Sequence, residues 1–269
     1  MGFASSVKEN RFMRPDPFFL VGCVRSGTTM LRDLLRRHPN LACPEETHFY
    51  RWGDPMGTDN LRKVLSSNPV LREHRKIDQI QESEFTRMME QSTSRADLYQ
   101  RYMQCYIERN KPQARRWFDK TPQNVYGAML MACSMPDARF VHIVRNPLNV
   151  VASLRLGKVI KVGALLGAIN YWTEAEHIMR GLKQAFPDRV YEMRYEDLMD
   201  DGPGHTRLLM SFLGEAYDPA WFADFVMTPS DHRGAEVLSP EDTQVVLQAC
   251  EAGMRRHGYL PAAGGAVQA

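Results

Sequence analysis

The chain has 269 residues, of which 43% are hydrophobic and 25% are charged, and its formal net charge is only +2. This is enough apolar material for one sizeable core, so we expect residues 1–269 to form a single domain. The near-neutral charge argues against a broad nucleic-acid surface, but it allows a small anionic ligand held by a few local cations.

Segments that would direct the chain to a membrane or an oxidising compartment are not evident. Residues 1–16 form a polar lead-in without the apolar centre of a signal peptide, and the longest apolar runs, such as "VGALLGAI", are far below the roughly 18 residues of a membrane span. The five cysteines are odd in number and form no C-x-x-C pair. We therefore expect a cytoplasmic protein with reduced thiols, no membrane segment and no metal centre.

The first elements in chain order are a strand and a helix. The apolar run Phe18–Val21 predicts a buried strand, and the spacing of Met30, Leu31, Leu34 and Leu35 predicts a helix over 28–37. "LAC" at 41–43 is compatible with a short strand. Residues 51–115 are polar with several amphipathic segments, notably 96–108, and predict a helical insertion or lid.

The second half of the chain alternates between strand and helix patterns. Strands are predicted at 116–119, 139–144 and 189–195, and helices after Pro122, from about Pro147, and over 165–184, 208–213 and 240–257. A disordered tail is expected at 262–269. This alternation predicts an α/β fold of the three-layer, P-loop-like kind, with a central, mainly parallel sheet.

The stretch "GCVRSGTT" after the first strand has the outline of a phosphate loop. Its glycine spacing matches the pattern G-x-x-x-x-G-K-[ST], but Thr28 stands where a nucleotide triphosphatase carries lysine. The strand at 139–144 ends in Arg145 instead of the acidic residue that would hold Mg²⁺. With backbone amides, a helix amino end and the cation of Arg25, the loop predicts direct, metal-free binding of phosphate groups. A plain strand-to-helix turn is the alternative, although it has no use for so many donors.

The stretch "RNPLNVVASL" offers a second anion site. If a helix begins near Pro147, its amino end lies at the carboxyl edge of the sheet, where ligands of open α/β sheets bind. Arg145 and Ser153, eight residues apart, would then hold a second phosphate together. Taken alone, each residue has a simpler explanation that is favoured: a surface ion pair for Arg145 and an ordinary hydroxyl inside a helix for Ser153.

Together, "FLVGCVRSGTTMLRDLL" and "RFVHIVRNPLNVVASL" resemble the 5′-phosphosulfate loop and the 3′-phosphate motif of sulfotransferases that use 3′-phosphoadenosine 5′-phosphosulfate (PAPS). The stretch "RSGTTMLRDLLRRHPNLACPEETHF" is similar in particular to the tyrosylprotein sulfotransferases and their bacterial relatives. The resemblance spans about residues 18–198, with a weaker match at "LSPEDTQ" and the "GY" that follows it.

The resemblance implies a role for each matching residue. The 5′-phosphosulfate would be bound by the loop residues Arg25, Ser26, Gly27, Thr28 and Thr29. The 3′-phosphate would be bound by Arg145 and Ser153, with Tyr195 of "RYEDL" near the nucleotide. Glu46 of "EET" would be the general base, and Lys120 of "DKTP" would contact the sulfate and the bridging oxygen.

Elementary chemistry agrees with these roles. Charge grows on the leaving phosphate during sulfuryl transfer, so cations and N–H donors belong there, and the acceptor hydroxyl needs a carboxylate to take its proton. Glu45 and Glu46 are adjacent on an extended segment, so only one of them faces the site and the other pairs or faces solvent. Lys120 precedes a helix amino end, an unfavourable place for a cation unless an anion is shared there.

The sequence therefore predicts a PAPS-dependent sulfotransferase acting on a hydroxyl of a small molecule, sugar or peptide. A P-loop nucleotide or small-molecule kinase and a non-catalytic nucleotide-binding protein are the alternatives. His48 stands where the tyrosylprotein group carries arginine, which bears on acceptor recognition. Four further residues are candidates for nucleotide contact or otherwise surface residues: Arg155, Lys158, His232 and Arg233.

Overall fold

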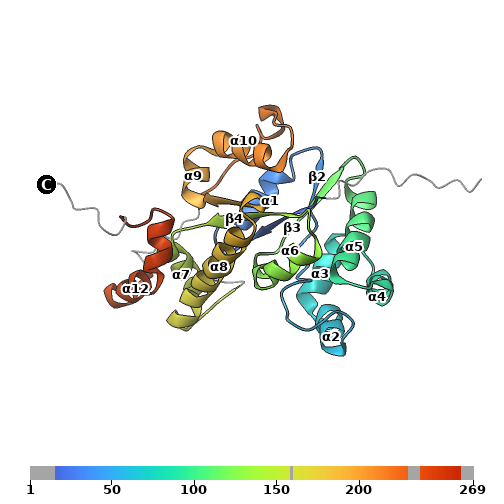
Figure 1. The fold of residues 1–269 in the computed structure, drawn as a ribbon, viewed down its shortest axis with the longest axis horizontal. Helices are drawn as coiled ribbons and strands as arrows, with labels where there is room; N and C mark the ends of the chain where they lie inside the picture. Colours follow the sequence, from blue (N-terminus) through green and yellow to red (C-terminus); the bar gives the residue numbers. More distant parts are fainter. Residues whose placement is uncertain (1–15, 158–159, 230–236, 262–269) are drawn as a thin grey trace, which may run out of the picture.

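A five-stranded, fully parallel sheet forms the centre of the molecule, in the order β2-β3-β1-β4-β5 (Figure 1). The computed structural model describes residues 16–157, 160–229 and 237–261. The strands are β1 (Phe18–Val21), β2 (Leu41–Ala42), β3 (Arg116–Lys120), β4 (Arg139–Val144) and β5 (Val190–Arg194). The predicted α/β fold with a parallel sheet is confirmed.

The central strand β1 is buried on both faces, which explains its unbroken apolar run. Phe18 and Leu20 belong to the core on one side of the sheet, and Phe19 and Val21 belong to the core on the other side. Parallel sheets covered on both faces have this kind of sequence. Because β1 lies between β3 and β4, the loop that follows it lies between the ends of these two strands.

Helices cover both faces of the sheet, giving three layers (Figure 1). One face is covered by α1 (Thr28–Leu35), α9 (Tyr195–Asp200) and α10 (Gly202–Leu213). The other is covered by α6 (Ala128–Ser134), α7 (Pro147–Leu156) and α8 (Leu165–Ala185), with α12 (Pro240–Arg256) packed on α7 and α8 at one end.

Four helices gather at the opposite end of the molecule, within the segment predicted to be helical. They are α2 (Asp59–Ser67), α3 (Pro69–Ile77), α4 (Glu82–Gln91) and α5 (Arg95–Asn110). Three begin at side-chain caps, from Thr58, Asn68 and Ser94. Their inner faces share one aromatic core, in which Phe49 packs against Phe85, Tyr99 and Tyr102.

Several elements differ from the sequence prediction, most of them by a single residue at one end. Helix α1 ends at Leu35 instead of residue 37, and residues Pro122–Gly127 form a 3₁₀ helix (η1) before α6. Helix α10 starts at Gly202, six residues before the predicted start, because the Asp201 side chain accepts from the Gly204 amide and caps it. Two short 3₁₀ turns complete the fold: η2 (Pro187–Arg189) and η3 (Pro219–Trp221). Residues 1–15 of the predicted lead-in and the predicted tail at 262–269 lie outside the described residues.

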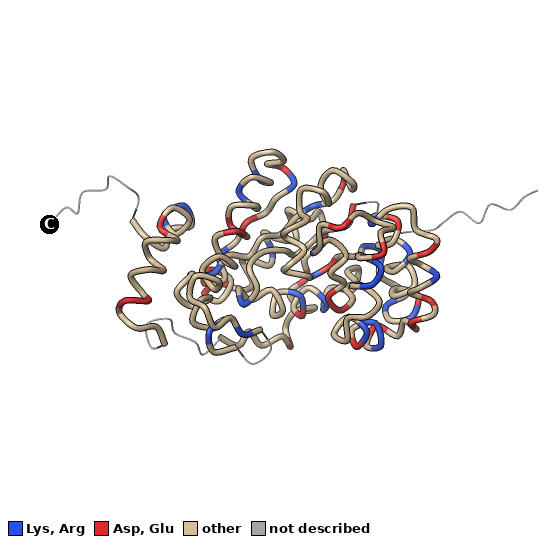
Figure 2. The backbone as a smooth tube through the Cα atoms, turned by 90° about the horizontal axis from the view of Figure 1, so that it is seen from below, with Lys and Arg blue, Asp and Glu red and all other residues tan. Residues whose placement is uncertain are grey.

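Charges of both signs are interspersed along the chain (Figure 2). All five cysteines are free thiols. Within the described residues, no helix combines the length and apolar composition needed to cross a bilayer.

Candidate active site

The loop between β1 and α1 has the compact backbone of an anion-binding loop. Gly27 has φ +90° and lies at the N-cap of α1, and Arg25 also has a left-handed φ of 71°. A Cβ atom at Gly27 would lie 2.4 Å from Cδ2 of Tyr195, so the ring of Tyr195 packs directly on the loop. Only glycine combines this backbone angle with this close approach.

Two polar atoms beside the loop are buried without a partner. The hydroxyl of Ser26 and the Nε of Arg145 have no hydrogen-bond partner within the described residues, and these residues are 0% and 4% exposed. Burial lowers the pKa of Arg145, which shows that its charge is poorly solvated. A buried donor left unpaired costs about 1–3 kcal/mol, so a phosphate oxygen accepting from these groups would stabilise the site.

Side chains from the loop and from α7 meet at the junction of β1 and β4. Arg25 Nε donates to Ser153 Oγ at 2.9 Å, and Arg145 Nη1 donates to the carbonyl of Arg25 at 3.2 Å. The Arg145 guanidinium lies over the ring of Tyr195, 4.6 Å from its centroid. The two sequence motifs therefore form one continuous cationic site.

Glu46 lies at the other side of the loop, between two cation-capable groups. The Lys120 ammonium donates to Glu46 Oε1 and, at 3.2 Å, to Thr29 Oγ1 of the loop, while His48 Nε2 lies 3.3 Å from Glu46 Oε2. Lys120 is only 2% exposed, unlike an ordinary lysine at a strand end. A carboxylate and an ammonium are thus held together at the amino end of α1.

The charge on Glu46 follows from these contacts. Burial by itself raises the pKa of this carboxyl, but the hydrogen bond from His48 and the charge of Lys120 lower it to about 2. His48 reaches Glu46 from a left-handed backbone conformation, with φ 56°, which is rare for a residue other than glycine. Glu46 is therefore ionised across the physiological pH range.

The adjacent Glu45 points away from the loop, as the alternation of an extended segment requires. Its carboxylate binds Arg32 at 2.8 Å and Arg36 at 3.1 Å, and its amide donates to Asp78 Oδ1. Burial raises the pKa of Glu45, but the two guanidinium groups more than offset this and hold it below its usual value. Glu45 thus fixes the segment that carries Glu46.

A buried polar network joins the segment of Glu46 to that of Lys120. The Asp119 carboxylate, which is fully buried, accepts from the hydroxyls of Thr47 and Thr121 and from the Asn124 amide. The Thr47 amide donates to Thr121 Oγ1 at 3.0 Å. Satisfied buried networks of this kind rigidify a site, so the positions of Glu46 and Lys120 are fixed relative to each other.

Comparison with known proteins identifies the family. A model of the sulfotransferase family matches residues 17–219. The chain belongs to the sulfotransferase family. It is 25% identical to omega-hydroxy-beta-dihydromenaquinone-9 sulfotransferase Stf3 of Mycobacterium bovis over 320 residues, which cover 96% of this chain and 78% of that protein. It is also 25% identical to protein-tyrosine sulfotransferase 1 of Danio rerio over 207 residues, 75% of this chain and 54% of the relative.

Solved sulfotransferase structures share the fold. The sulfotransferase domain of the Synechococcus PCC 7002 olefin synthase superposes with a TM-score of 0.62 at 23% identity, over 88% of this chain and 84% of that one. Mouse SULT7A1, solved in complex with PAP, superposes with a TM-score of 0.55 at 13% identity, over 92% and 87% of the two chains.

The structure brings most of the predicted site residues of this sulfotransferase together. Thr28 is the first residue of α1 and is buried, and Tyr195 contacts both motifs. The Arg25 side chain, expected at the 5′ side, extends instead to Ser153. Arg155 is engaged by Asp242 of α12 at 2.8 Å. The other three candidates, Lys158, His232 and Arg233, lie outside the described residues.

Some contacts of the site carry little signal in the sequence. The approach of His48 to Glu46 depends on its left-handed backbone, which no residue preference announces. The carbonyl of Arg145 accepts from the indole of Trp172 on α8, 27 residues away. The Trp172 contact depends on how α8 packs against the end of β4, and no local motif encodes it.

Proposed function

We propose that this sulfotransferase moves the sulfuryl group of PAPS to an acceptor hydroxyl by in-line transfer, with Glu46 as general base. The observation that carries the proposal is the position of Glu46. Its carboxylate touches Lys120, and Lys120 also touches Thr29 of the loop. A base and a cation are thereby paired beside a loop suited to an anionic donor.

The donor residues fit a molecule with two separate phosphate sites. The loop amides with Ser26, Gly27, Thr28 and Thr29 suit the 5′-phosphosulfate, and the unpartnered Arg145 Nε with Ser153 suits the 3′-phosphate. Tyr195 packs against both groups of residues and would border the nucleotide. The PAP bound in the structure of mouse SULT7A1, which has this fold, supports the same donor here.

In the proposed reaction, the acceptor oxygen forms a bond to sulfur while the bond from sulfur to the phosphate oxygen breaks. The acceptor proton passes to Glu46, and PAP leaves with the electron pair of the broken bond. Lys120 and the loop amides would face the oxygens on which charge grows. Arg25, whose Nε donates to Ser153 Oγ in this structure, would have to turn away from Ser153 to join them. Donors fixed in advance at such oxygens lower the barrier without reorganisation during the reaction.

The contact of Lys120 with Glu46 explains how the base becomes active. A carboxylate with a pKa of about 2 is a weak base, and the hydrogen bond from His48 and the contact with the Lys120 ammonium both lower this pKa. When Lys120 turns to the sulfuryl oxygens, Glu46 loses this contact and its proton affinity rises. The existing 3.2 Å bond from Lys120 to Thr29 means that the required movement is small.

The acceptor is a hydroxyl compound whose pocket we place beside α2–α5. Glu46 and Lys120 lie at the two ends of the segment that contains these helices, so residues 51–115 lie next to the proposed base. The two relatives compared above are named for a hydroxylated menaquinone derivative and for protein tyrosine. Labelled PAPS should therefore be tested with an alcohol, a phenol, a sugar and a tyrosyl peptide.

Substitution of Glu46 tests the base. Glu46→Gln should lower turnover with the best acceptor by roughly 10²–10⁴-fold, the usual contribution of general base catalysis, and should leave PAP affinity nearly unchanged. Glu73→Gln is the matched control, because Glu73 is an exposed glutamate of α3 that pairs with Lys76 on the surface. Turnover that survives in Glu46→Gln would remove Glu46 as base.

Calorimetry without added metal tests the donor. PAP should bind more tightly than ATP, because only PAP carries the 3′-phosphate that Arg145 and Ser153 would hold. ATP binding as tight as that of PAP would contradict the proposed donor and favour a kinase.

A further inference from the structure

The C-terminal part of the described chain, which lies beyond the residues matched by the family model, packs against the proposed 3′-phosphate site. Helix α12 crosses α8 so closely that a Cβ atom at Gly253 would lie 2.6 Å from the Trp172 ring. Asp242 at the start of α12 binds Arg155 at the end of α7. Helix α12 is therefore held against α7 and α8, the two helices that directly follow β4.

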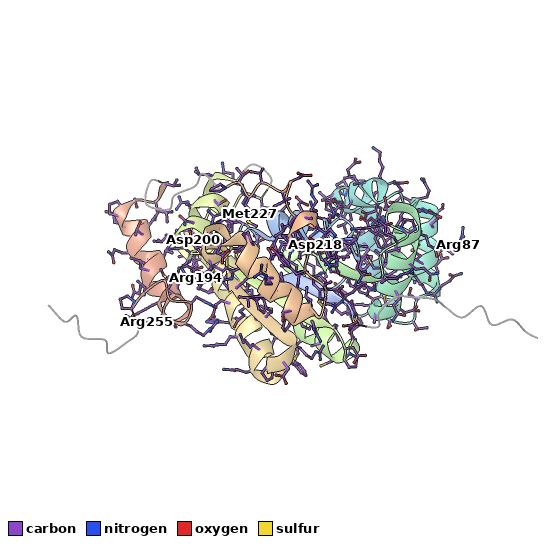
Figure 3. All side chains as sticks on the ribbon, turned by 90° about the horizontal axis from the view of Figure 1, so that it is seen from above. Arg87, Arg194, Asp200, Asp218, Met227 and Arg255 are labelled. Atoms are coloured by element: carbon purple, nitrogen blue, oxygen red, sulfur yellow. The ribbon has the colours of Figure 1, made fainter. Side chains whose placement is uncertain are left out.

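Tyr259, just after α12, brings its hydroxyl to the end of β4. This hydroxyl donates to Glu196 Oε2 at 2.7 Å and lies 3.3 Å from the carbonyl oxygen of Val144. The Arg194 guanidinium covers the Tyr259 ring at 4.7 Å, and Figure 3 labels Arg194 beside the helix that carries Arg255. Burial and the charge of Glu196 both raise the pKa of Tyr259, so it remains a neutral donor.

Three consecutive residues around Arg145 are each held through their backbone. The Val144 carbonyl lies against the Tyr259 hydroxyl, the Arg145 carbonyl accepts from Trp172 Nε1 at 2.9 Å, and the Asn146 amide donates to Glu196 Oε1 at 3.0 Å. Two of these three contacts involve Tyr259 or its partner Glu196. The backbone that carries Arg145 is thus fixed by the C-terminal segment and by α8.

We propose that Tyr259 is a positioning residue for recognition of the 3′-phosphate. Through Glu196 and the backbone of residues 144–146, it sets the direction in which the Arg145 guanidinium leaves β4. Glu196 directly follows Tyr195, whose ring packs against the Arg145 guanidinium. The contact between Tyr259 and Glu196 therefore also helps to position the Tyr195 ring. The inference rests on the proposed PAPS donor, because the phosphate that Arg145 would bind is the 3′-phosphate of that donor.

Two nucleotides that differ only in the 3′-phosphate test the inference: PAP and adenosine 5′-monophosphate (AMP). In Tyr259→Phe, the affinity for PAP measured by calorimetry should fall about tenfold, as loss of a hydrogen bond to a charged group implies, while the affinity for AMP changes less than about twofold. The matched control is Tyr217→Phe, because Tyr217 also lies under an arginine, Arg207, but packs against Phe222 in the core that lines the opposite face of the sheet.

A second variant guards against a general loss of stability. Glu196→Gln keeps the shape of the side chain, should reproduce the loss of PAP affinity, and should add little to Tyr259→Phe in the double variant, because both changes break one contact. Equal losses of PAP and AMP affinity in Tyr259→Phe, or unchanged discrimination between them, would overturn the inference. If the wild-type protein itself binds PAP no better than AMP, the proposed donor fails instead.

Discussion

Replacing Gly27 by alanine tests the packing on which the loop depends. Gly27 combines a φ of +90° with a neighbour, Cδ2 of Tyr195, only 2.4 Å from the position of an added Cβ atom. Alanine therefore meets two independent penalties, one in the backbone and one in packing. The second penalty acts directly on the ring that supports Arg145.

The two penalties can be estimated separately. A left-handed backbone costs an alanine about 1 kcal/mol. Displacing a packed ring from a tight core costs about 1–3 kcal/mol. We therefore expect Gly27→Ala to lower the free energy of unfolding by about 2–4 kcal/mol, measured by urea denaturation at neutral pH.

The chain supplies matched controls for both penalties. Gly57 also has a left-handed φ, +86°, but no atom lies within 4 Å of an added Cβ, so Gly57→Ala should cost only the backbone term of about 1 kcal/mol. Gly53 has neither feature, so Gly53→Ala should change stability by less than about 0.5 kcal/mol. PAP affinity should fall only in Gly27→Ala, because only there must Tyr195 move. If Gly27→Ala destabilises the protein no more than Gly57→Ala does, the contact between Tyr195 and the loop is not as described.

Two further substitutions test buried charges away from the loop. Burial raises the pKa of Asp78 from its ordinary 3.8 to about 6, so the folded chain binds this proton more tightly than the unfolded chain does. The free energy of unfolding of the wild-type protein should therefore fall by about 2 kcal/mol between pH 4 and pH 6.5, relative to that of Asp78→Asn. If urea denaturation gives parallel pH profiles for the two proteins, this prediction is wrong. Arg116 is fully buried against Asp16 and Glu215, so Arg116→Met should cost about 3–5 kcal/mol in urea denaturation, and a loss below 1 kcal/mol would contradict the ion pairs.

The parts of the fold that sequence reasoning predicts are those set by local patterns. β1 is an unbroken apolar run because both of its faces are buried, and β4 is apolar except for Arg139 and His142. The glycine spacing marks the loop between β1 and α1. The prediction that only one glutamate of the pair would face the loop follows from extended geometry alone, and Glu45 does bind arginines elsewhere. Family resemblance named the remaining site residues, and the roles of Glu46 and Lys120 stay proposals.

The parts that were not predicted depend on contacts between distant segments. The first six residues of α10 carry little helical signal, since two of them are glycines and one is a proline; the helix begins there because Asp201 caps the Gly204 amide and the proline falls in the first turn. The contacts that fix the backbone of residues 144–146 come from Trp172, Glu196 and Tyr259, which lie in three separate parts of the chain. No local spacing in the sequence predicts these contacts, because they form only when α8, α9 and the segment after α12 pack together.

The hydrogen bond from the Thr47 amide to Thr121 closes an excursion of 74 residues that carries all of α2–α5. Glu46 lies immediately before this segment and Lys120 lies at its far end, next to Thr121, and the Asp119 network fixes both positions. The entropy of closing such a loop changes only slowly with its length. Helices can therefore be added, lost or reshaped inside the excursion at small thermodynamic cost while the spacing of Glu46 and Lys120 is preserved. The fold thus separates a segment whose length can change from a chemical centre whose geometry is fixed elsewhere.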